Sequence, residues 1–145
     1  MRALPIVLVV ALVGFAPAPL PRRDRHRDDL TDVAGTWEFV RWERNGKREP
    51  RSEERILVEM TKDSFTLVLK GRGKGETYVM HLEPRASPPA FSWSMNGRVM
   101  FVGSYRLQKD QMTMIFTNGT NLAQRPTDFD ARQVQFRFIM RRVKR

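Results

Sequence analysis

Cysteine is absent from this sequence, and histidine occurs only twice among its 145 residues. Without cysteine the chain can form no disulfide, and it carries no thiol nucleophile and no lipid-anchored cysteine. His26 lies in a charged stretch, whereas His81 lies on a predicted strand with its side chain opposite the core face. Metal sites gather several cysteine, histidine or carboxylate side chains, so we expect no metal, no cofactor and no enzymatic activity.

Motifs for phosphate binding and for acid–base or nucleophilic catalysis are missing as well. Gly71–Gly75 is rich in glycine, but it lies between two predicted strands and lacks the spacing of a phosphate-binding loop. We interpret this segment as a hairpin tip. Glu49, Glu53 and Glu54 crowd one stretch but are flanked by arginines, which indicates a solvated loop rather than a catalytic pair. No serine lies in a nucleophile elbow.

One apolar run stands out, from Leu4 to Phe15, after a short positive start at Met1-Arg2. It is short for a membrane span and is followed by small residues, Ala16-Pro17-Ala18, that fit a cleavage site. We therefore predict that residues 1–20 are a signal peptide and that the protein is exported to the periplasm, the cell envelope or the exterior. Because cleavage there leaves proline at the new N-terminus, a retained N-terminal anchor is the alternative.

Acidic residues are few compared with basic ones, 16 against 26, which gives a formal net charge of +10. Residues 21–29 are charged, lack apolar side chains and are predicted to form a disordered tether. A charge this high favours contact with polyanions such as envelope polymers, anionic lipid or nucleic acid. Export argues against nucleic acid as the natural partner. A soluble basic surface without a dedicated partner is the alternative interpretation.

Residues 30–145 are long enough for one domain held by its own core. Leu30–Ala34 is predicted to form one helical turn, and turn signals such as Asn45-Gly46 and Asn96-Gly97 separate short apolar strands. This pattern indicates a β-sandwich or a β-barrel, and eight antiparallel strands suffice to close a barrel. The predicted strands are Thr36–Arg44, Ile56–Met60, Phe65–Lys70, Glu76–Leu82, Ala90–Trp93, Arg98–Leu107, Met112–Thr117 and Val134–Val143.

Two positions depart from simple strand alternation. In the first strand Trp37 and Phe39 share one face while Val40 and Trp42 share the other, so either a β-bulge lies near Phe39 or both faces are covered. Gly103, on the inner face of its strand, predicts a bend or the close approach of a large neighbour, for which we expect a tryptophan. Asn45–Arg55 and Asn118–Arg132 are predicted to be long loops.

Five short motifs spread over residues 28–145 together resemble a family of small exported domains that is abundant in planctomycete bacteria, lipocalin-like in pattern and without an established activity. They are Gly35-Thr36-Trp37, Asn45-Gly46-Lys47, Gly103-x-Tyr105-x-Leu107, Arg125-Pro126-Thr127-Asp128-Phe129 and Met140-Arg141-Arg142. The resemblance implies an up-and-down eight-stranded barrel with Gly35 and Trp37 at its closed end. It also implies that an arginine of the last strand covers the tryptophan, and the strand parity selects Arg142 for a cation–π contact.

Two functions follow from a barrel of this kind. The first, favoured by the number of large side chains on the inner faces, is a structural or interaction module with a filled core and a basic surface that contacts polyanions or another protein. The alternative is a carrier that holds a small apolar or amphipathic ligand inside the barrel, where methionines make adaptable walls. The residues predicted to line that cavity are Phe65, Tyr78, Met80, Phe101, Tyr105, Met114, Phe116 and Phe138.

Overall fold

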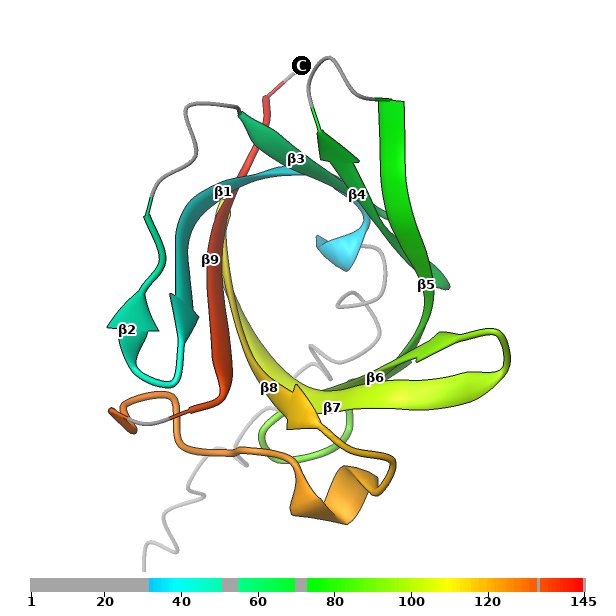
Figure 1. The fold of residues 1–145 in the computed structure, drawn as a ribbon, viewed down its shortest axis with the longest axis vertical. Helices are drawn as coiled ribbons and strands as arrows, with labels where there is room; N and C mark the ends of the chain where they lie inside the picture. The colour runs from blue at the N-terminus through cyan, green and yellow to red at the C-terminus, as the bar shows by residue number, and fades with distance from the viewer. Residues whose placement is uncertain (1–31, 51–54, 70–72, 133, 145) are drawn as a thin grey trace, which may run out of the picture.

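The computed structural model describes residues 32–50, 55–69, 73–132 and 134–144, which form a closed antiparallel β-barrel (Figure 1). β1 pairs with β3, each strand from β3 to β8 pairs with the next one in the chain, and β1 pairs with β9 to close the sheet. The two-residue strand β2 pairs with the end of β1 alone, so the barrel has eight strands, as predicted. The strands are β1 Gly35–Arg44, β2 Lys47–Arg48, β3 Ile56–Met60, β4 Ser64–Leu69, β5 Gly73–Glu83, β6 Ala90–Met95, β7 Arg98–Gln108, β8 Gln111–Asn118 and β9 Phe136–Arg142.

Helical structure within the described residues is confined to Asp32 and Val33 and to a 3-10 turn at Leu122–Gln124. The 3-10 turn lies in a segment that the sequence predicted to be loop. The predicted signal peptide and tether, and the start of the predicted helical turn at Leu30, fall outside the described residues. Among the residues that are described, no helix is long and apolar enough to cross a membrane.

The strand boundaries agree with prediction to within two residues, except at β5, whose start at Gly73 is earlier than expected. Gly73 and Gly75 were predicted to belong to a hairpin tip, but they lie in the strand, where β5 follows β4 past a shift in register between Thr66 and Val68. A glycine can extend a strand as well as turn it, because it lacks a side chain that would prefer one conformation. The two Asn-Gly turns are confirmed, with positive φ at both residues of each pair.

The β1 strand contains the predicted bulge. Its pairing with β9 shifts by one residue between Phe39 and Arg41, which leaves Val40 outside and 47% exposed. After this shift Trp42 points inward, so Trp37, Phe39 and Trp42 all pack in or against the core. Of the two alternatives that the sequence left open, the bulge is therefore correct.

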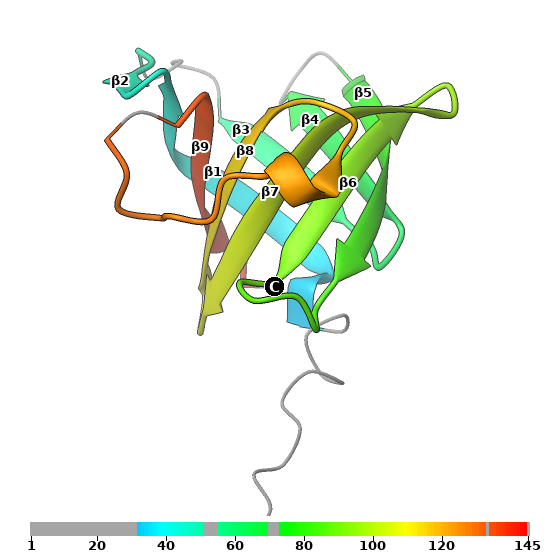
Figure 2. The same cartoon turned by 90° about the horizontal axis from the view of Figure 1, so that it is seen from below.

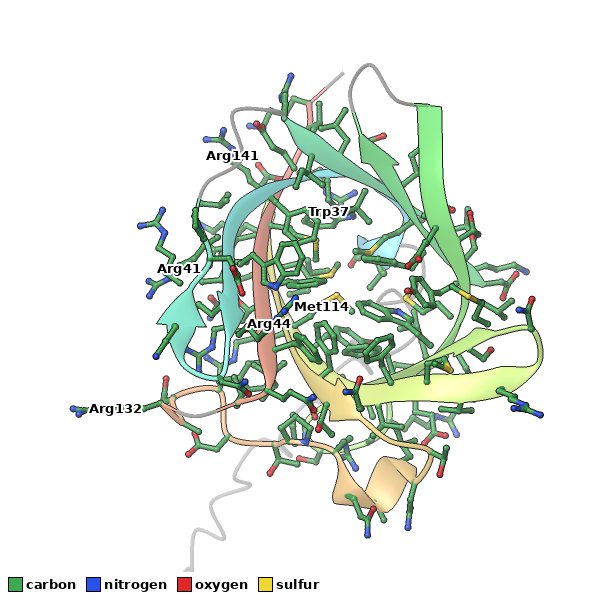
Figure 3. All side chains as sticks on the ribbon, viewed as in Figure 1. Trp37, Arg41, Arg44, Met114, Arg132 and Arg141 are labelled. Carbon is green, nitrogen blue, oxygen red and sulfur yellow. The ribbon has the colours of Figure 1, made fainter. Side chains whose placement is uncertain are left out.

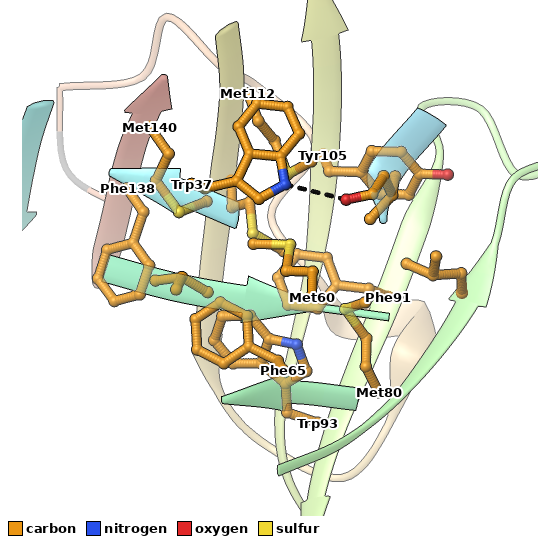
Figure 4. Packing of buried hydrophobic residues seen from close by; sticks show 14 of the residues in the cluster. Trp37, Met60, Phe65, Met80, Phe91, Trp93, Tyr105, Met112, Phe138 and Met140 are labelled. Atoms are coloured by element: carbon orange, nitrogen blue, oxygen red, sulfur yellow. Dashed lines mark hydrogen bonds between the residues drawn. The ribbon is translucent and has the colours of Figure 1, made fainter. Parts of the chain in front are cut away.

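Aromatic rings fill the middle of the barrel around Trp93 (Figure 4). The Trp93 ring stacks on Phe65 at a centroid distance of 4.1 Å and lies 4.7 Å from Phe91 and 4.9 Å from Phe116. Gly103 permits this packing, because a Cβ there would lie 2.6 Å from both Phe91 and Phe116. The large neighbour expected at Gly103 is thus a pair of phenylalanines and not a tryptophan.

A second, smaller apolar cluster lies on the outer face of the barrel. Ile115 points outward from β8 and is completely buried beneath Phe129 and Val134, which belong to the segment between β8 and β9. The Ser104 hydroxyl donates a hydrogen bond of 2.7 Å to the Pro126 carbonyl and fixes the same segment to β7. The predicted loop Asn118–Arg132 is therefore packed against the sheet (Figure 2).

Candidate functional site

One end of the barrel, which we call the Trp37 end, is closed by a set of mutual contacts. The fully buried Trp37 indole donates a hydrogen bond of 3.0 Å to the Val33 carbonyl. The Arg142 guanidinium lies 4.3 Å from the centre of the Trp37 ring, which is the contact that the strand parity predicts. Arg142 also donates hydrogen bonds to the carbonyl oxygens of Ala34, at 2.9 Å, and of Asp32. The indole N–H and the Arg142 guanidinium therefore both donate to backbone carbonyl oxygens at this end.

Gly35 is needed at the same end for two reasons. Its φ of 140° lies in a region that residues with side chains rarely adopt. A Cβ at this position would lie only 2.9 Å from the Arg142 guanidinium, at the atom that binds the Ala34 carbonyl. The glycine therefore makes room for the arginine that covers Trp37. The three residues that the sequence selected as a structural signature, Gly35, Trp37 and Arg142, lie together.

The eight predicted cavity residues all point into the barrel or pack against its core. Six of them are more than nine-tenths buried: Phe65, Met80, Tyr105, Met114, Phe116 and Phe138. Tyr78 and Phe101 are half-buried at the opposite end. Since the rings of Phe65, Phe116 and Phe138 lie 4.1, 4.9 and 6.3 Å from that of Trp93, these side chains fill the interior of the barrel with one another.

The opposite end, which we call the Trp42 end, has half-buried aromatic side chains. The side chains that share this position are Phe39, Trp42, Tyr78, Phe101 and Phe136. The Arg44 guanidinium lies 5.8 Å from the Trp42 ring and 5.8 Å from the Phe136 ring. The indole N–H groups of Trp42 and Trp93 are buried, and no described residue accepts a hydrogen bond from them. The sequence did not single out Trp42 and Trp93 as ligand contacts, because the bulge that turns Trp42 inward could be placed only approximately.

Tyr78 has a carboxylate beside it at the Trp42 end. Its hydroxyl donates a hydrogen bond of 2.5 Å to Glu76, two residues earlier on β5. Burial and then the Glu76 carboxylate, which accepts this bond and repels the phenolate, raise the pKa of Tyr78 to about 12. Tyr78 is therefore a neutral hydrogen-bond donor at physiological pH.

The charge of the protein is distributed unevenly around the barrel. The adjacent strands β1, β2 and β9 carry seven basic and two acidic residues, whereas the other described residues comprise ten basic and nine acidic ones. Arg41, Arg132 and Arg141 point outward on this side of the molecule (Figure 3). We call the exposed cations Arg41, Lys47, Arg48, Arg132 and Arg141 the basic face.

A buried carboxylate organises part of this face. Glu43 points outward from β1 but is only 3% exposed, because Arg41 and Arg137 both pair with it. Arg137 lies 2.8 Å from the Glu43 carboxylate and also donates hydrogen bonds to the carbonyl oxygens of Phe129 and Ala131. One arginine therefore joins β1, β9 and the segment over the outer face. The sequence did not reveal this network, since Glu43 and Arg137 at its centre are 94 residues apart.

A second carboxylate of β1 is shared by cations from two other parts of the chain. Glu38 accepts a bidentate interaction from Arg55, with both distances 2.9 Å, and lies 3.7 Å from Arg141. Arg55, with Arg141 as a smaller contributor, lowers the pKa of the Glu38 carboxyl. Glu38 therefore remains ionised and neutralises part of the positive charge near β3, so the uncompensated charge lies toward β2.

Over residues 32–50, 55–69, 73–132 and 134–144, no three histidine or acidic side chains gather in a way that could hold a metal ion. His81 is 73% exposed on the outer face of β5, with Glu83 at 3.8 Å. The chain matches no protein-family model, no curated protein and no solved structure in the comparisons made.

Proposed function

We propose that this protein is an exported, non-enzymatic interaction module that binds polyanions through the basic face. The observation that carries the proposal is the concentration of positive charge on β1, β2 and β9 beside a nearly neutral remainder. Lys47, Arg48 and Arg132 have no carboxylate partner among the described residues, so their charges are available to a ligand. Clustered cations raise the local concentration of a polyanion and accelerate its association.

The filled interior supports the same conclusion. A carrier of the lipocalin type needs space inside the barrel, whereas here the Trp93 ring lies against aromatic rings from three other strands, β4, β8 and β9. The core would then serve to hold a rigid closed sheet, which presents β1, β2 and β9 in a fixed geometry. Fixed cations bind a polymer better than mobile ones, because less conformational entropy is lost on binding.

The test compares two triple variants that remove the same charge from different sides. Lys47→Gln, Arg48→Gln and Arg132→Gln remove the three charges of the basic face that have no described carboxylate partner, and Lys62→Gln, Arg85→Gln and Arg98→Gln remove three exposed cations elsewhere. With long-chain polyphosphate as the probe, we expect the first variant to lose affinity by about tenfold or more and the second by less than about threefold. Binding should also weaken steeply with salt. Equal losses would mean that net charge alone acts, and the basic face would not be a site.

A second candidate function, a carrier for a small amphipathic ligand, is favoured by one observation at the Trp42 end. The buried Trp42 and Trp93 N–H groups lack acceptors, and an unsatisfied buried donor costs about 1–3 kcal/mol. A ligand with a carbonyl or carboxylate oxygen among the half-buried rings would supply one. Native mass spectrometry of protein from an exporting host, compared with the denatured sample, distinguishes the two. A discrete mass lost on denaturation favours the carrier, and an unliganded mass favours the filled module.

Export is the part of the proposal that rests on residues 1–20. If they act as a signal peptide, the protein recovered from outside the cytoplasm begins near Ala18. N-terminal sequencing of that protein measures the cleavage site directly. A chain that retains Met1 and sediments with membranes would favour the uncleaved anchor, and recovery in the cytoplasm alone would contradict export.

A further inference from the structure

A groove lies on the outside of the barrel wall, at the same end of the strands as Trp37. It has a volume of about 380 Å³, within the range of sites for small molecules. The β5–β6 connection, the second half of β7 and the segment between β8 and β9 form its walls. The residues that line it are Ser87, Pro88, Pro89, Tyr105, Arg106, Leu107, Thr127 and Phe129. We call it the Pro88 groove.

The walls of the Pro88 groove are fixed to one another by hydrogen bonds. The Tyr105 amide donates to the Pro89 carbonyl at 2.9 Å, which joins β7 to the β5–β6 connection. Arg125 donates to the Pro88 carbonyl at 3.2 Å and to the Leu122 carbonyl at 3.3 Å, so it joins that connection to the opposite wall. Phe129 is anchored in the outer apolar cluster. The groove is therefore preformed, and a ligand would not have to order it.

The polar side chains that line the groove are one arginine, Arg106, and the hydroxyls of Ser87 and Thr127. Arg106 is exposed and lies 4.3 Å from the centre of the Phe129 ring, and no carboxylate among the described residues pairs with it. None of the described residues that line the groove is acidic. The hydroxyls of Ser87 and Thr127 have no partner within the described part of the chain, so both can donate. Around them lie the apolar surfaces of Pro88, Pro89, Leu107 and Phe129.

From this combination we propose that the Pro88 groove binds a small amphipathic carboxylate. The apolar part of the ligand lies against Pro88, Pro89 and Phe129, and the carboxylate accepts hydrogen bonds from Arg106. An arginine side chain is suited to this role, because its planar guanidinium binds both oxygens of a carboxylate at once. The ligand carries one negative charge, since the groove lining offers one cation. The residues that line the groove include none of the cations of the basic face.

The probe for this site is 3-phenylpropionate, titrated into the ¹⁵N-labelled protein while amide shifts are recorded. We expect saturable shifts around residues 87–89, 105–107 and 127–129. The neutral analogue 3-phenylpropanamide has the same apolar body and should bind about tenfold more weakly. No saturable shift at the highest soluble concentration of the acid, or equal binding of acid and amide, would overturn the proposal.

Arg106→Gln is the variant that separates the arginine from the groove as a whole. Arg106 is exposed, so the variant should fold, and its amide spectrum checks this before titration. We expect about a tenfold loss of affinity for the acid and little change for the amide. Arg98→Gln, at the other end of β7, is the matched control and should leave both unchanged. If Arg98→Gln weakens binding as much as Arg106→Gln, the effect is one of net charge and no site exists here.

Discussion

The two ends of the barrel are built from similar residues and differ in how completely their polar groups are satisfied. At the Trp37 end a tryptophan, an arginine and backbone carbonyls form a closed set of contacts, with the indole N–H and the guanidinium both paired. At the Trp42 end a tryptophan and an arginine also meet, but the distance is 5.8 Å, the indole N–H has no partner and the rings are half-buried. Stability should therefore come from the first end and adaptability from the second.

The physical reason lies in what the chain supplies beside each tryptophan. Val33 and Ala34 approach the Trp37 end just before β1 begins and offer carbonyl oxygens to both side chains. Beside Trp42 the chain continues into the β1–β2 hairpin, where the Trp42 carbonyl accepts from Glu49 and no described acceptor reaches the indole. Buried donors normally have hydrogen-bond partners, so the polar groups at the Trp42 end are less fully hydrogen-bonded than those at the Trp37 end.

The largest expected difference between the ends is in core stability. Trp37→Ala should lower the free energy of unfolding by about 3–5 kcal/mol, because it removes a fully buried aromatic side chain. Trp42→Ala should lower it by less than half as much, since that ring is half-buried and its N–H makes no bond. Urea denaturation measures both changes. Equal losses would show that the two ends contribute alike and would invalidate the comparison.

The arginines provide the next test. Arg142→Ala should lower the free energy of unfolding by about 2 kcal/mol, because it removes the contact with Trp37 and the hydrogen bonds to two carbonyls. Arg44→Ala should change it by less than about 0.5 kcal/mol, since the Arg44 side chain is 52% exposed. Arg142→Lys keeps the charge and should recover only part of the loss. Thermal unfolding of the three variants checks this order, and full recovery by lysine would contradict the packing role.

Replacing each tryptophan with phenylalanine removes the indole N–H and tests how much that group contributes to stability at each end. Trp37→Phe leaves the Val33 carbonyl without its donor and should cost about 1–3 kcal/mol. Trp42→Phe loses some buried ring surface but also removes a buried N–H donor for which no described residue is a partner. These two effects should nearly cancel, so the free energy of unfolding should change by less than about 1 kcal/mol. Chemical denaturation at one pH measures both. A loss at Trp42 as large as that at Trp37 would mean that the Trp42 N–H is bonded in solution.

The smallest effect concerns pH. In a Tyr105→Phe background the absorbance of the phenolate reports Tyr78 alone, and it should titrate at about 12. Because this pKa is above the ordinary value near 10, the stabilisation is intact below pH 10 and is lost as pH rises toward 12. Glu76→Gln should move the titration of Tyr78 toward its ordinary value. An unchanged titration would show that burial alone raises the pKa.

Much of the barrel could be predicted because each strand carries its own signals. Phe136, Phe138 and Met140 recur at every second residue and predicted the inward face of β9, and extending this parity placed Arg142 over Trp37. Asn45-Gly46 and Asn96-Gly97 gave two turns, since these pairs readily adopt positive φ. Such patterns are local, so a strand shows them without its partners.

Other features could not be predicted because they depend on residues far apart in the chain. The burial of Glu43 requires Arg137 from the opposite end of the sequence. Ile115 would be an exposed residue of β8 if Phe129 and Val134 did not fold back over it. The Pro88 groove likewise needs three separate segments, and none of them suggests a site alone.

The sequence by itself determined the all-β architecture, the inward faces of most strands and the strongly basic character, because side-chain period, turn chemistry and composition are properties of short segments. The tertiary structure alone decided where the charge gathers, which tryptophan N–H is satisfied and which surface is hollow. These depend on the closure of β1 against β9 and on the segment that packs outside β8. The physical reason is that hydrogen-bond satisfaction and electrostatic potential are set by distances in space, which alternation along a strand does not specify.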